Sequence, residues 1–439
     1  MLDTADVVVV GTGVAGLFCA LNLPRTAKVV MLTKDQCENC DSFLAQGGIC
    51  TLRSPEDYNS FFEDTMRAGH YENNAASVEL MLRGAPEVIS DIVGYGVEFD
   101  KEDNGEYQYT REGAHSAYRI LHHDDLTGRE ITEKLLKEAR GRENIEILEY
   151  AAMVDLMVKD GRAVGVVMRY RGELMPLYAR AVVLATGGIG GLFKNSTNFR
   201  HITADALAIA LIRGIKTQDV SYIQIHPTAL YSNKPGRRFL ISESVRGEGA
   251  VLLNKAGERF TDELKPRDVV SAAIHRQMEK DGMDHVYLSV THLNKEMVPR
   301  RFPNIYKKCL EEGYDLTREP IPVTPAQHYY MGGILSGGEG QTSLTGLYAV
   351  GEAGCNGVHG RNRLASNSLL ESLVFSKRAA LQIGARLNGW KAVLMKPDLK
   401  RYEDQAALKS RYKQVIFDEI RRKDEAFYDQ WCNDEDIDG

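Results

Sequence analysis

The chain has 439 residues, of which 43% are hydrophobic and 26% charged, as in folded globular proteins of two or three domains. Its net charge is −7 and no basic cluster stands out, so nucleic acid is not an expected partner. No stretch approaches the roughly 18 consecutive apolar residues of a transmembrane helix. The chain begins directly with a predicted strand rather than a secretion signal. We therefore expect no membrane partner and a cytoplasmic location.

The seven cysteines are an odd number for a chain without a secretion signal, which favours reduced thiols. Cys37, Cys40 and Cys50 cluster around a Cys-x-x-Cys pattern, for which a zinc or redox site is the alternative. A structural zinc ion needs four ligands, and no second pair completes the set. We expect no metal site.

The first predicted element is a strand over 7–10 that runs into a glycine-rich turn, Gly11-x-Gly13-x-x-Gly16. An apolar run without alternation is typical of a strand buried on both faces. Gly11 permits the tight turn, Gly13 lets backbone approach a pyrophosphate, and Gly16 lets the next helix pack on the sheet. In this setting the motif predicts a dinucleotide site.

A helix over 14–23 and a second strand over 28–32 follow the turn. The general rule places an acid at the end of this second strand, where it binds the ribose hydroxyls. Here the strand ends in Thr33 and Lys34 instead. The motif alone therefore does not say which dinucleotide is bound.

Two later strands repeat the logic of an apolar strand followed by glycines. One covers 181–184 before Gly187-Gly188, and the other covers 346–350 before Gly351-Glu352. Between the second strand and residue 181, the sequence predicts helical periodicity over 54–94, a loop with short strands over 95–125, a helix over 128–140, strands over 145–148 and 152–158, and a hairpin over 163–169 and 174–179. A cofactor domain split by a long, less regular insertion explains this spacing, with the active site in the crevice.

We therefore predict an α/β fold with a Rossmann-like cofactor domain built from residues 1–221 and 333–390. Residues 222–332 form an α+β capping domain that contributes to the substrate site. Residues 391–439 form a short, charged helical tail of one or two helices that frays over 433–439.

Two long motifs make the chain resemble the fumarate reductase and succinate dehydrogenase flavoprotein superfamily. They are SFLAQGGI at 42–49 and HGRNRLASNSLLE at 359–371. The resemblance covers residues 5–385 and implies that the dinucleotide is FAD. The respiratory members attach FAD covalently through a histidine five residues before Gln46. Asp41 stands there, so the resemblance implies non-covalent FAD.

Within the superfamily the chain most resembles the L-aspartate oxidase family. The discriminating segment is TREGAHS at 110–116, in which Glu112 replaces the glutamine of enzymes that act on plain dicarboxylates. The ammonium group of aspartate needs an anionic partner when buried. The resemblance implies oxidation of L-aspartate to 2-iminosuccinate, with fumarate or dioxygen as final acceptor. Quinolinate synthase, which uses the product in NAD biosynthesis, is then a possible partner.

The resemblance also assigns roles to the conspicuous histidines, arginines and acids. Arg binds a carboxylate through a planar fork, which also fixes orientation. The residues expected to bind substrate carboxylates are His226, His328 and Arg363, with Ser242 and Glu243 at the family's Thr-Glu position. Arg267, in Pro-Arg-Asp, matches the family's proton-transfer arginine. Because arginine is normally too basic to release a proton, an electrostatic clamp is the alternative.

The resemblance also implies which residues contact FAD. They are Thr12, Gly13, Val14, Ala15, Lys34, Asp41, Ser42, Phe43, Leu44, Ala45, Gln46, Gly47, Gly48, Asp205, Glu352, Ser368 and Leu369. Asp205 lies between alanines where the family usually has glycines. Those alanines fit only if neither position needs a positive φ.

Two further departures from the family pattern bear on function. Arg361 replaces the usual alanine and either faces solvent or adds positive potential at the substrate mouth. The tail after residue 390 is shorter than the family's usual helical bundle. Two alternative functions stay open: a soluble fumarate reductase or succinate dehydrogenase-type flavoprotein, and a flavin subunit that passes electrons within a larger complex.

Overall fold

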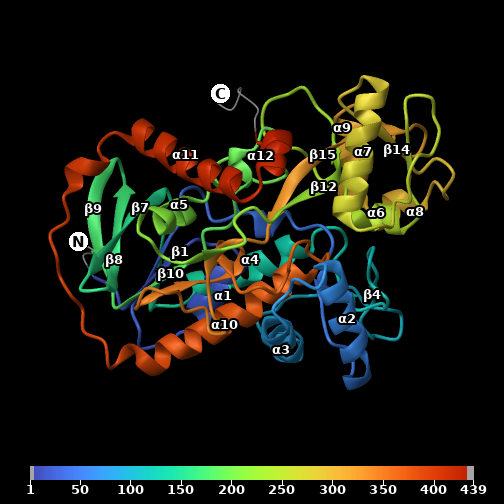
Figure 1. The fold of residues 1–439 in the computed structure, drawn as a ribbon. Coiled ribbons are helices and arrows are strands. Elements are labelled where there is room, and N and C mark those ends of the chain that lie inside the picture. The colour runs from blue at the N-terminus through green and yellow to red at the C-terminus, as the bar shows by residue number, and fades with distance from the viewer. Residues whose placement is uncertain (1–3, 433–439) are drawn as a thin grey trace.

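The computed structural model describes residues 4–432 and is centred on a five-stranded parallel sheet (Figure 1). The strand order is β17-β10-β1-β2-β6. The strands are β1 (Val7–Val10), β2 (Val29–Leu32), β6 (Ile145–Leu148), β10 (Ala181–Leu184) and β17 (Leu347–Ala349). The three strands that precede glycines, β1, β10 and β17, are direct neighbours although they are far apart in sequence. Their carboxyl ends therefore meet at one edge of the sheet.

Helices and a second small sheet cover the two faces of the parallel sheet. On one face lie α1 (Val14–Asn22), α3 (Ala75–Gly94), α4 (Thr127–Arg140) and α10 (Asn367–Leu387). On the other lie an antiparallel sheet of β7 (Ala151–Lys159), β8 (Arg162–Tyr170) and β9 (Glu173–Tyr178), with α5 (Asp205–Ile212) and α11 (Gln405–Lys423). Because side chains alternate along a strand, Val7 and Val9 enter the first core and Val8 and Val10 the second. This explains the unbroken valine run.

The segment expected to be irregular forms a four-stranded antiparallel sheet with a core of its own. The strand order is β12-β15-β14-β13, with bounds Ile223–Leu230, Ile321–Tyr330, Val286–Ser289 and Val251–Leu253. Helices α6 (Glu243–Gly247), α7 (Arg267–Asp281), α8 (Met297–Arg301) and α9 (Pro303–Glu311) surround it (yellow in Figure 1). The expectation of irregularity was wrong, while the exact domain bounds stay a prediction.

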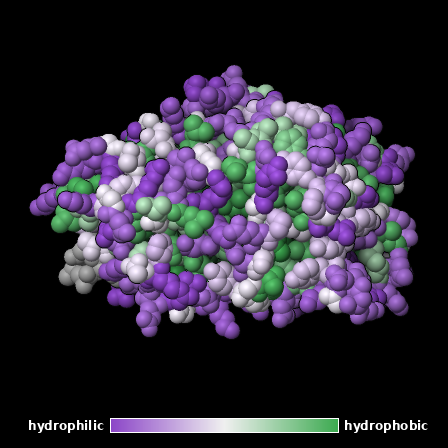
Figure 2. Space-filling model, turned by 90° about the horizontal axis from the view of Figure 1, so that it is seen from below, coloured by the Kyte–Doolittle hydropathy of each residue, from purple (hydrophilic) through white to green (hydrophobic). Residues whose placement is uncertain are grey.

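Short elements connect these parts. They are α2 (Tyr58–Ala68), α12 (Glu425–Trp431), and the strands β3 (Ile49–Cys50), β4 (Tyr109–Thr110), β5 (Ile120–Leu121), β11 (Thr217–Gln218), β16 (Gly333–Leu335) and β18 (Gly354–Cys355). Up to residue 432 the tail contains the α-helices α11 and α12, and the predicted fraying over 433–439 lies outside the described residues. Among described helices, none is both long and apolar enough to span a membrane. Figure 2 shows polar groups interspersed with small apolar ones on the lower face.

The turn before α5 corrects the expectation about the alanines beside Asp205. Ala204 is the N-cap of α5 and adopts φ 52°, in the left-handed region. A side chain with a Cβ is strained there, whereas glycine is not. The position therefore does need a positive φ, and the chain tolerates alanine at a cost in stability.

Replacing Ala204 by Gly should raise the free energy of unfolding by about 0.5–1 kcal/mol, because relief of the strain outweighs the added chain entropy. Urea unfolding monitored by circular dichroism measures this change. Ala206→Gly, inside α5, is the matched control and should lower stability by a similar amount. Destabilisation by both substitutions would show that Ala204 is not strained.

Candidate functional site

One large cavity begins at the carboxyl edge of the parallel sheet and extends to β12 and β15 of the antiparallel sheet. Every residue that the sequence predicted for cofactor or substrate lines it, with Val14 as the exception. The side chain of Val14 is buried in the core, and its backbone N–H donates to Ser42 Oγ at 3.2 Å. The structure thus brings together segments from both ends of the chain.

The amino end of α1 faces this cavity through Thr12, Gly13 and Ala15. Gly11 has φ 115°, and a Cβ there would lie 2.0 Å from the carbonyl oxygen of Ala185. Only glycine therefore fits the turn between β1 and α1. A helix start that is open to a cavity attracts anions, which suits a pyrophosphate.

The acid that is missing from the end of β2 is supplied by another segment. Lys34 Nζ lies 2.6 Å from Asp205 Oδ2, and it also donates to Thr203 Oγ1 at 2.9 Å. Asp205 itself accepts a hydrogen bond from Thr203 Oγ1 at 2.6 Å. A carboxylate thus stands beside this strand end, although it belongs to α5.

Several buried polar atoms on the cavity wall lack partners among the described residues. They are Asp41 Oδ2, Gln46 Oε1 and Thr186 Oγ1. Buried polar groups are normally hydrogen-bonded, so such atoms indicate a polar ligand. A pyrophosphate-binding helix end, a paired lysine and acid, and unsatisfied donors and acceptors together fit FAD.

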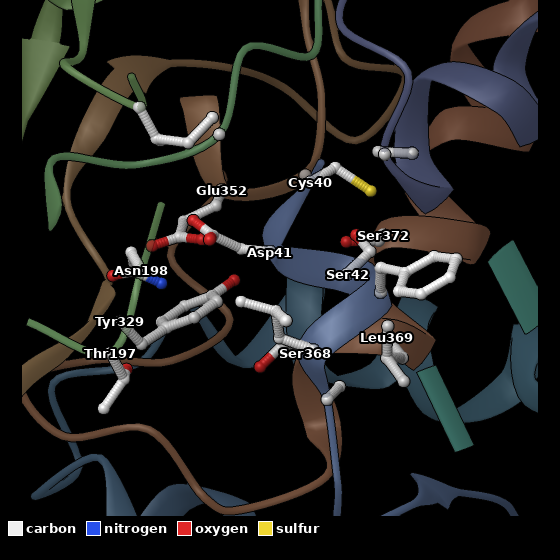
Figure 3. A pocket seen from close by; sticks show the side chains of 18 of the residues that line it. Cys40, Asp41, Ser42, Thr197, Asn198, Tyr329, Glu352, Ser368, Leu369 and Ser372 are labelled. Atoms are coloured by element: carbon white, nitrogen blue, oxygen red, sulfur yellow. The ribbon is translucent and has the colours of Figure 1, made fainter. Parts of the chain in front are cut away.

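Two acids face each other in the cofactor part of the cavity. Figure 3 shows the carboxyl groups of Asp41 and Glu352 pointing toward one another. Burial raises the pKa of Asp41 to about 7, although the N–H of Phe199 donates to its Oδ1 at 2.9 Å. Burial, and then the charge of Asp41, raise the pKa of Glu352 to about 8. This region disfavours negative charge.

At the opposite end of the cavity, one amide holds two arginines. Gln224 Oε1 accepts from Arg267 Nη1 at 2.8 Å and from Arg363 Nε at 3.3 Å. Gln224 Nε2 donates to Asn362 Oδ1 and to the carbonyl of Arg363, both at 2.9 Å. Burial, and then the charge of Arg267, lower the pKa of Arg363 to about 10. The guanidinium groups of Arg267 and Arg363 are thus fixed side by side. Guanidinium groups pair well with carboxylates, so the arrangement suits a ligand with two carboxylates.

The two histidines of the site are neutral hydrogen-bonding groups rather than cations. Burial, followed by the charge of Arg267, lowers the pKa of both His226 and His328 well below the usual value. His226 Nδ1 accepts from the N–H of Thr228 at 3.1 Å, so its proton is on Nε2. That Nε2 is buried and has no partner among the described residues. It is available to donate to a ligand.

Glu112 is buried between serines. Its Oε1 accepts from Ser244 Oγ at 2.9 Å and its Oε2 from Ser366 Oγ at 2.5 Å. A Cβ on Gly47 would lie 2.5 Å from Glu112 Oε1, so glycine is needed there for the carboxylate to reach the cavity. Ser242, which the sequence assigned to the substrate site, lines the cavity and is also the N-cap of α6. Its Oγ accepts from the N–H of Ser244 at 3.3 Å.

A chain of buried charges leads away from the cavity. Arg267 Nε donates to Glu243 Oε2 at 2.5 Å, and Arg246 Nη2 lies 3.7 Å from the same oxygen. Burial opposes ionisation of Glu243, but Arg267 and Arg246 hold its pKa below the usual value. Arg246 is fully buried, and burial lowers its pKa. Arg267, Glu243 and Arg246 therefore form a continuous array of groups that carry protons.

Sequence reasoning missed Gln224 and Arg246. Both lie inside motifs that had been noted for their neighbours, at 224–228 and 241–249. Gln224 precedes His226 by two residues on β12, so both side chains leave the same face of the strand. That spacing was a usable signal. No feature of the sequence indicated that Arg246 is buried, because arginine is usually exposed.

The comparisons with known proteins agree with this geometry. The profile of the family described as FAD binding domain matches residues 6–369. Among solved structures, a variant of E. coli quinol fumarate reductase has a TM-score of 0.83 and 30% identity, with 96% of this chain and 74% of that chain covered. Fold and site thus define an FAD-binding flavoprotein of the fumarate reductase type.

Two curated relatives narrow this class. L-aspartate oxidase of Clostridium perfringens is 48% identical, with 96% of this chain and 95% of the relative covered. L-aspartate oxidase of Clostridium acetobutylicum is 50% identical, with 86% and 87% covered. The chain belongs to the L-aspartate oxidase family.

The raised pKa of Asp41 predicts how pH affects the FAD-free protein. Its favourable, protonated state is fully present below pH 4 and is lost as pH rises through about 7. The side chain of the Asp41→Asn variant cannot ionise. At pH 8.5 its free energy of unfolding should therefore exceed that of wild type by at least about 1.4 kcal/mol, the equivalent of one pKa unit. Urea unfolding at pH 5.5 and 8.5 measures the difference. Asp103→Asn, in an exposed turn, is the control. Parallel pH profiles for wild type and Asp41→Asn would contradict the assignment.

Proposed function

We propose that this protein oxidises L-aspartate to 2-iminosuccinate. The observation that carries the proposal is the balance of charge at the substrate end of the cavity. Arg267 and Arg363 line that end with Glu112 and Glu243, and Arg246 lies directly behind Glu243, so these five buried groups have a formal charge of one positive unit in excess. L-Aspartate has a net charge of −1 and neutralises this excess, whereas succinate, at −2, does not.

Each proposed contact follows from a side chain already placed. Arg363 and Arg267 bind the two carboxylates, and His226 and His328 donate hydrogen bonds as neutral imidazoles. Glu112 receives the ammonium group, which needs an anionic partner away from water. These positions orient the Cα–H bond of the substrate, and orientation contributes a large part of the rate.

FAD, bound without a covalent link, supplies the two-electron oxidising chemistry, with fumarate or dioxygen as final acceptor. The residues proposed to hold FAD are the FAD contacts implied by the sequence that also line the cavity. They begin with Thr12 at the first glycine turn and end with Leu369 in α10. Asp41 supports the non-covalent mode, because a carboxylate occupies the position of the attachment histidine. The chain itself removes the proton lost from the amine. In this proposal the Nε proton of Arg267 moves to Glu243 Oε2, 2.5 Å away, as the guanidinium takes up the amine proton and so keeps its charge; an electrostatic clamp is the alternative role of Arg267.

The product defines the next reaction. 2-Iminosuccinate hydrolyses readily, so an enzyme that condenses it, quinolinate synthase in NAD biosynthesis, is the proposed consumer and possible partner. All seven cysteines are buried free thiols, which supports the proposed cytoplasmic location. The capping role of residues 222–332 remains part of the same proposal.

The purified protein loaded with FAD tests the function. L-Aspartate under air should produce hydrogen peroxide and oxaloacetate, and fumarate should replace dioxygen under nitrogen. Oxidation of succinate without turnover of aspartate would favour the fumarate reductase-type alternative. Activity with neither substrate in the isolated chain would favour the electron-transfer subunit.

Arg363→Leu should lower kcat/KM for L-aspartate at least about 100-fold, because it removes the fork and leaves the substrate carboxylate unpaired in a buried site. Bound FAD should persist, as measured by its absorbance after gel filtration. Arg363→Lys keeps the charge without the fork and should be intermediate. Full activity of Arg363→Leu would show that the substrate lies elsewhere.

Glu112→Gln should lower kcat/KM for L-aspartate oxidation about 30-fold or more, since the ammonium group loses its partner. Fumarate carries no ammonium, so its reduction should fall less than about three-fold. Measuring both reactions on one preparation makes fumarate the internal control. Equal losses in the two reactions would remove the specificity role of Glu112.

A further inference from the structure

The segment of residues 69–73, between α2 and α3, has no role in the binding of cofactor or substrate described above. His70 and Tyr71 adopt φ of 58° and 59°, so two consecutive non-glycine residues lie in the left-handed region. Such residues are uncommon and persist only where surrounding contacts hold them. The contacts that hold this segment reach both sides of the substrate cavity.

On one side, the segment is bonded to the loop that carries Arg363. The carbonyl of Gly69 accepts from the N–H of Arg361 at 3.2 Å. Asn73 Nδ2 donates to the carbonyl of Val358 at 2.7 Å. These hydrogen bonds use backbone groups of the loop, so they fix the path of its main chain ahead of Arg363.

On the other side, the segment contacts the antiparallel sheet and its helix α7. His70 Nε2 lies 3.0 Å from Asp268 Oδ2, and Asp268 is the neighbour of Arg267 in the first turn of α7. The hydroxyl of Tyr222 donates to Glu72 Oε2, and Tyr222 directly precedes β12. Both anchors are therefore within two residues of groups of the substrate site: Arg267, which lines the cavity, and Gln224, which holds Arg267 and Arg363.

Arg361, which the family pattern left unexplained, joins the same cluster. Its side chain is 58% exposed, with Nη1 3.9 Å from Glu72 Oε1 and the guanidinium 5.8 Å from the ring centroid of Tyr222. It therefore faces solvent at the junction of the two parts of the fold. Its positive charge lies beside the carboxylate that Tyr222 also contacts.

We propose that residues 69–73 form a latch that holds Arg267 and Arg363 at the separation the substrate requires. His70 and Glu72 are the positioning residues, and Asp268, Tyr222 and Arg361 are their anchors. The substrate in this statement rests on the proposed function, whereas the latch itself rests on the contacts. The His70–Asp268 contact is nearly half-exposed, and exposed polar contacts contribute little to global stability, so its loss should leave the melting temperature near that of wild type.

Steady-state kinetics of the FAD-loaded enzyme with L-aspartate test the latch. His70→Ala and Asp268→Ala should each raise KM about five- to ten-fold, because the arginines lose alignment, and should lower kcat by a smaller factor, because Arg267 keeps its bond to Glu243. The double variant should be no worse than either single one, since both remove one contact. The swapped pair, His70→Asp with Asp268→His, should recover KM to within about three-fold of wild type.

Two further variants separate the latch from a general loss of structure. Glu63→Ala removes the acceptor in α2 to which the hydroxyl of Tyr71 donates, without touching the antiparallel sheet, and it should leave KM unchanged. Tyr222→Phe removes the second contact and should raise KM in the same direction as His70→Ala. Wild-type KM in both His70→Ala and Tyr222→Phe, or losses that multiply in the double variant, would overturn the latch.

Binding of succinate, followed by the change it causes in the flavin absorbance spectrum, provides a readout that needs no turnover. The latch variants should raise its dissociation constant by the same factor as KM, with melting temperatures near that of wild type. An unchanged dissociation constant would overturn the latch. If wild type bound succinate but did not oxidise aspartate, the proposed function would fail while the latch stayed testable.

Discussion

The burial of several charges at one point is the constraint on which the substrate site depends. Arg246, Arg267, Arg363, Glu112 and Glu243 are all nearly inaccessible to water. Each charge alone would cost several kcal/mol to bury, so the group is stable only as a set with matched partners. Gln224 satisfies two of these arginines through one amide. Because the members come from α6, α7 and two loops that are far apart in sequence, the site exists only when the whole fold is assembled.

The two ends of the cavity follow opposite electrostatic rules. At the substrate end, Arg267 and Arg246 hold the pKa of Glu243 below its usual value, and burial together with the charge of Arg267 lowers the pKa of both histidines. At the cofactor end, Asp41 and Glu352 face each other, and burial raises the pKa of both. One end thus selects an anionic substrate by charge, while the other offers hydrogen bonds to a larger polar ligand.

Contiguous motifs carried most of what the sequence predicted. The valine strand with its glycine turn, and the motifs at 42–49 and 359–371, predicted the parallel sheet, the FAD-binding family and the cavity wall. Relations across the fold were not predictable. Lys34 pairs with Asp205 from another segment, and Ala204 adopts a left-handed conformation. Local sequence reports the chemistry of a residue, but it does not report which distant group neutralises it or the strain that packing imposes.

The central claim is that the substrate end is matched to a dicarboxylate that also carries one ammonium group. Anaerobic mixing of the FAD-loaded protein with L-aspartate, and separately with succinate, tests it in a single turnover. Flavin absorbance near 450 nm is the observable, since reduction bleaches it. The account predicts rapid bleaching by L-aspartate and much slower bleaching by succinate. Equal rates with the two substrates, or faster reduction by succinate, would contradict it.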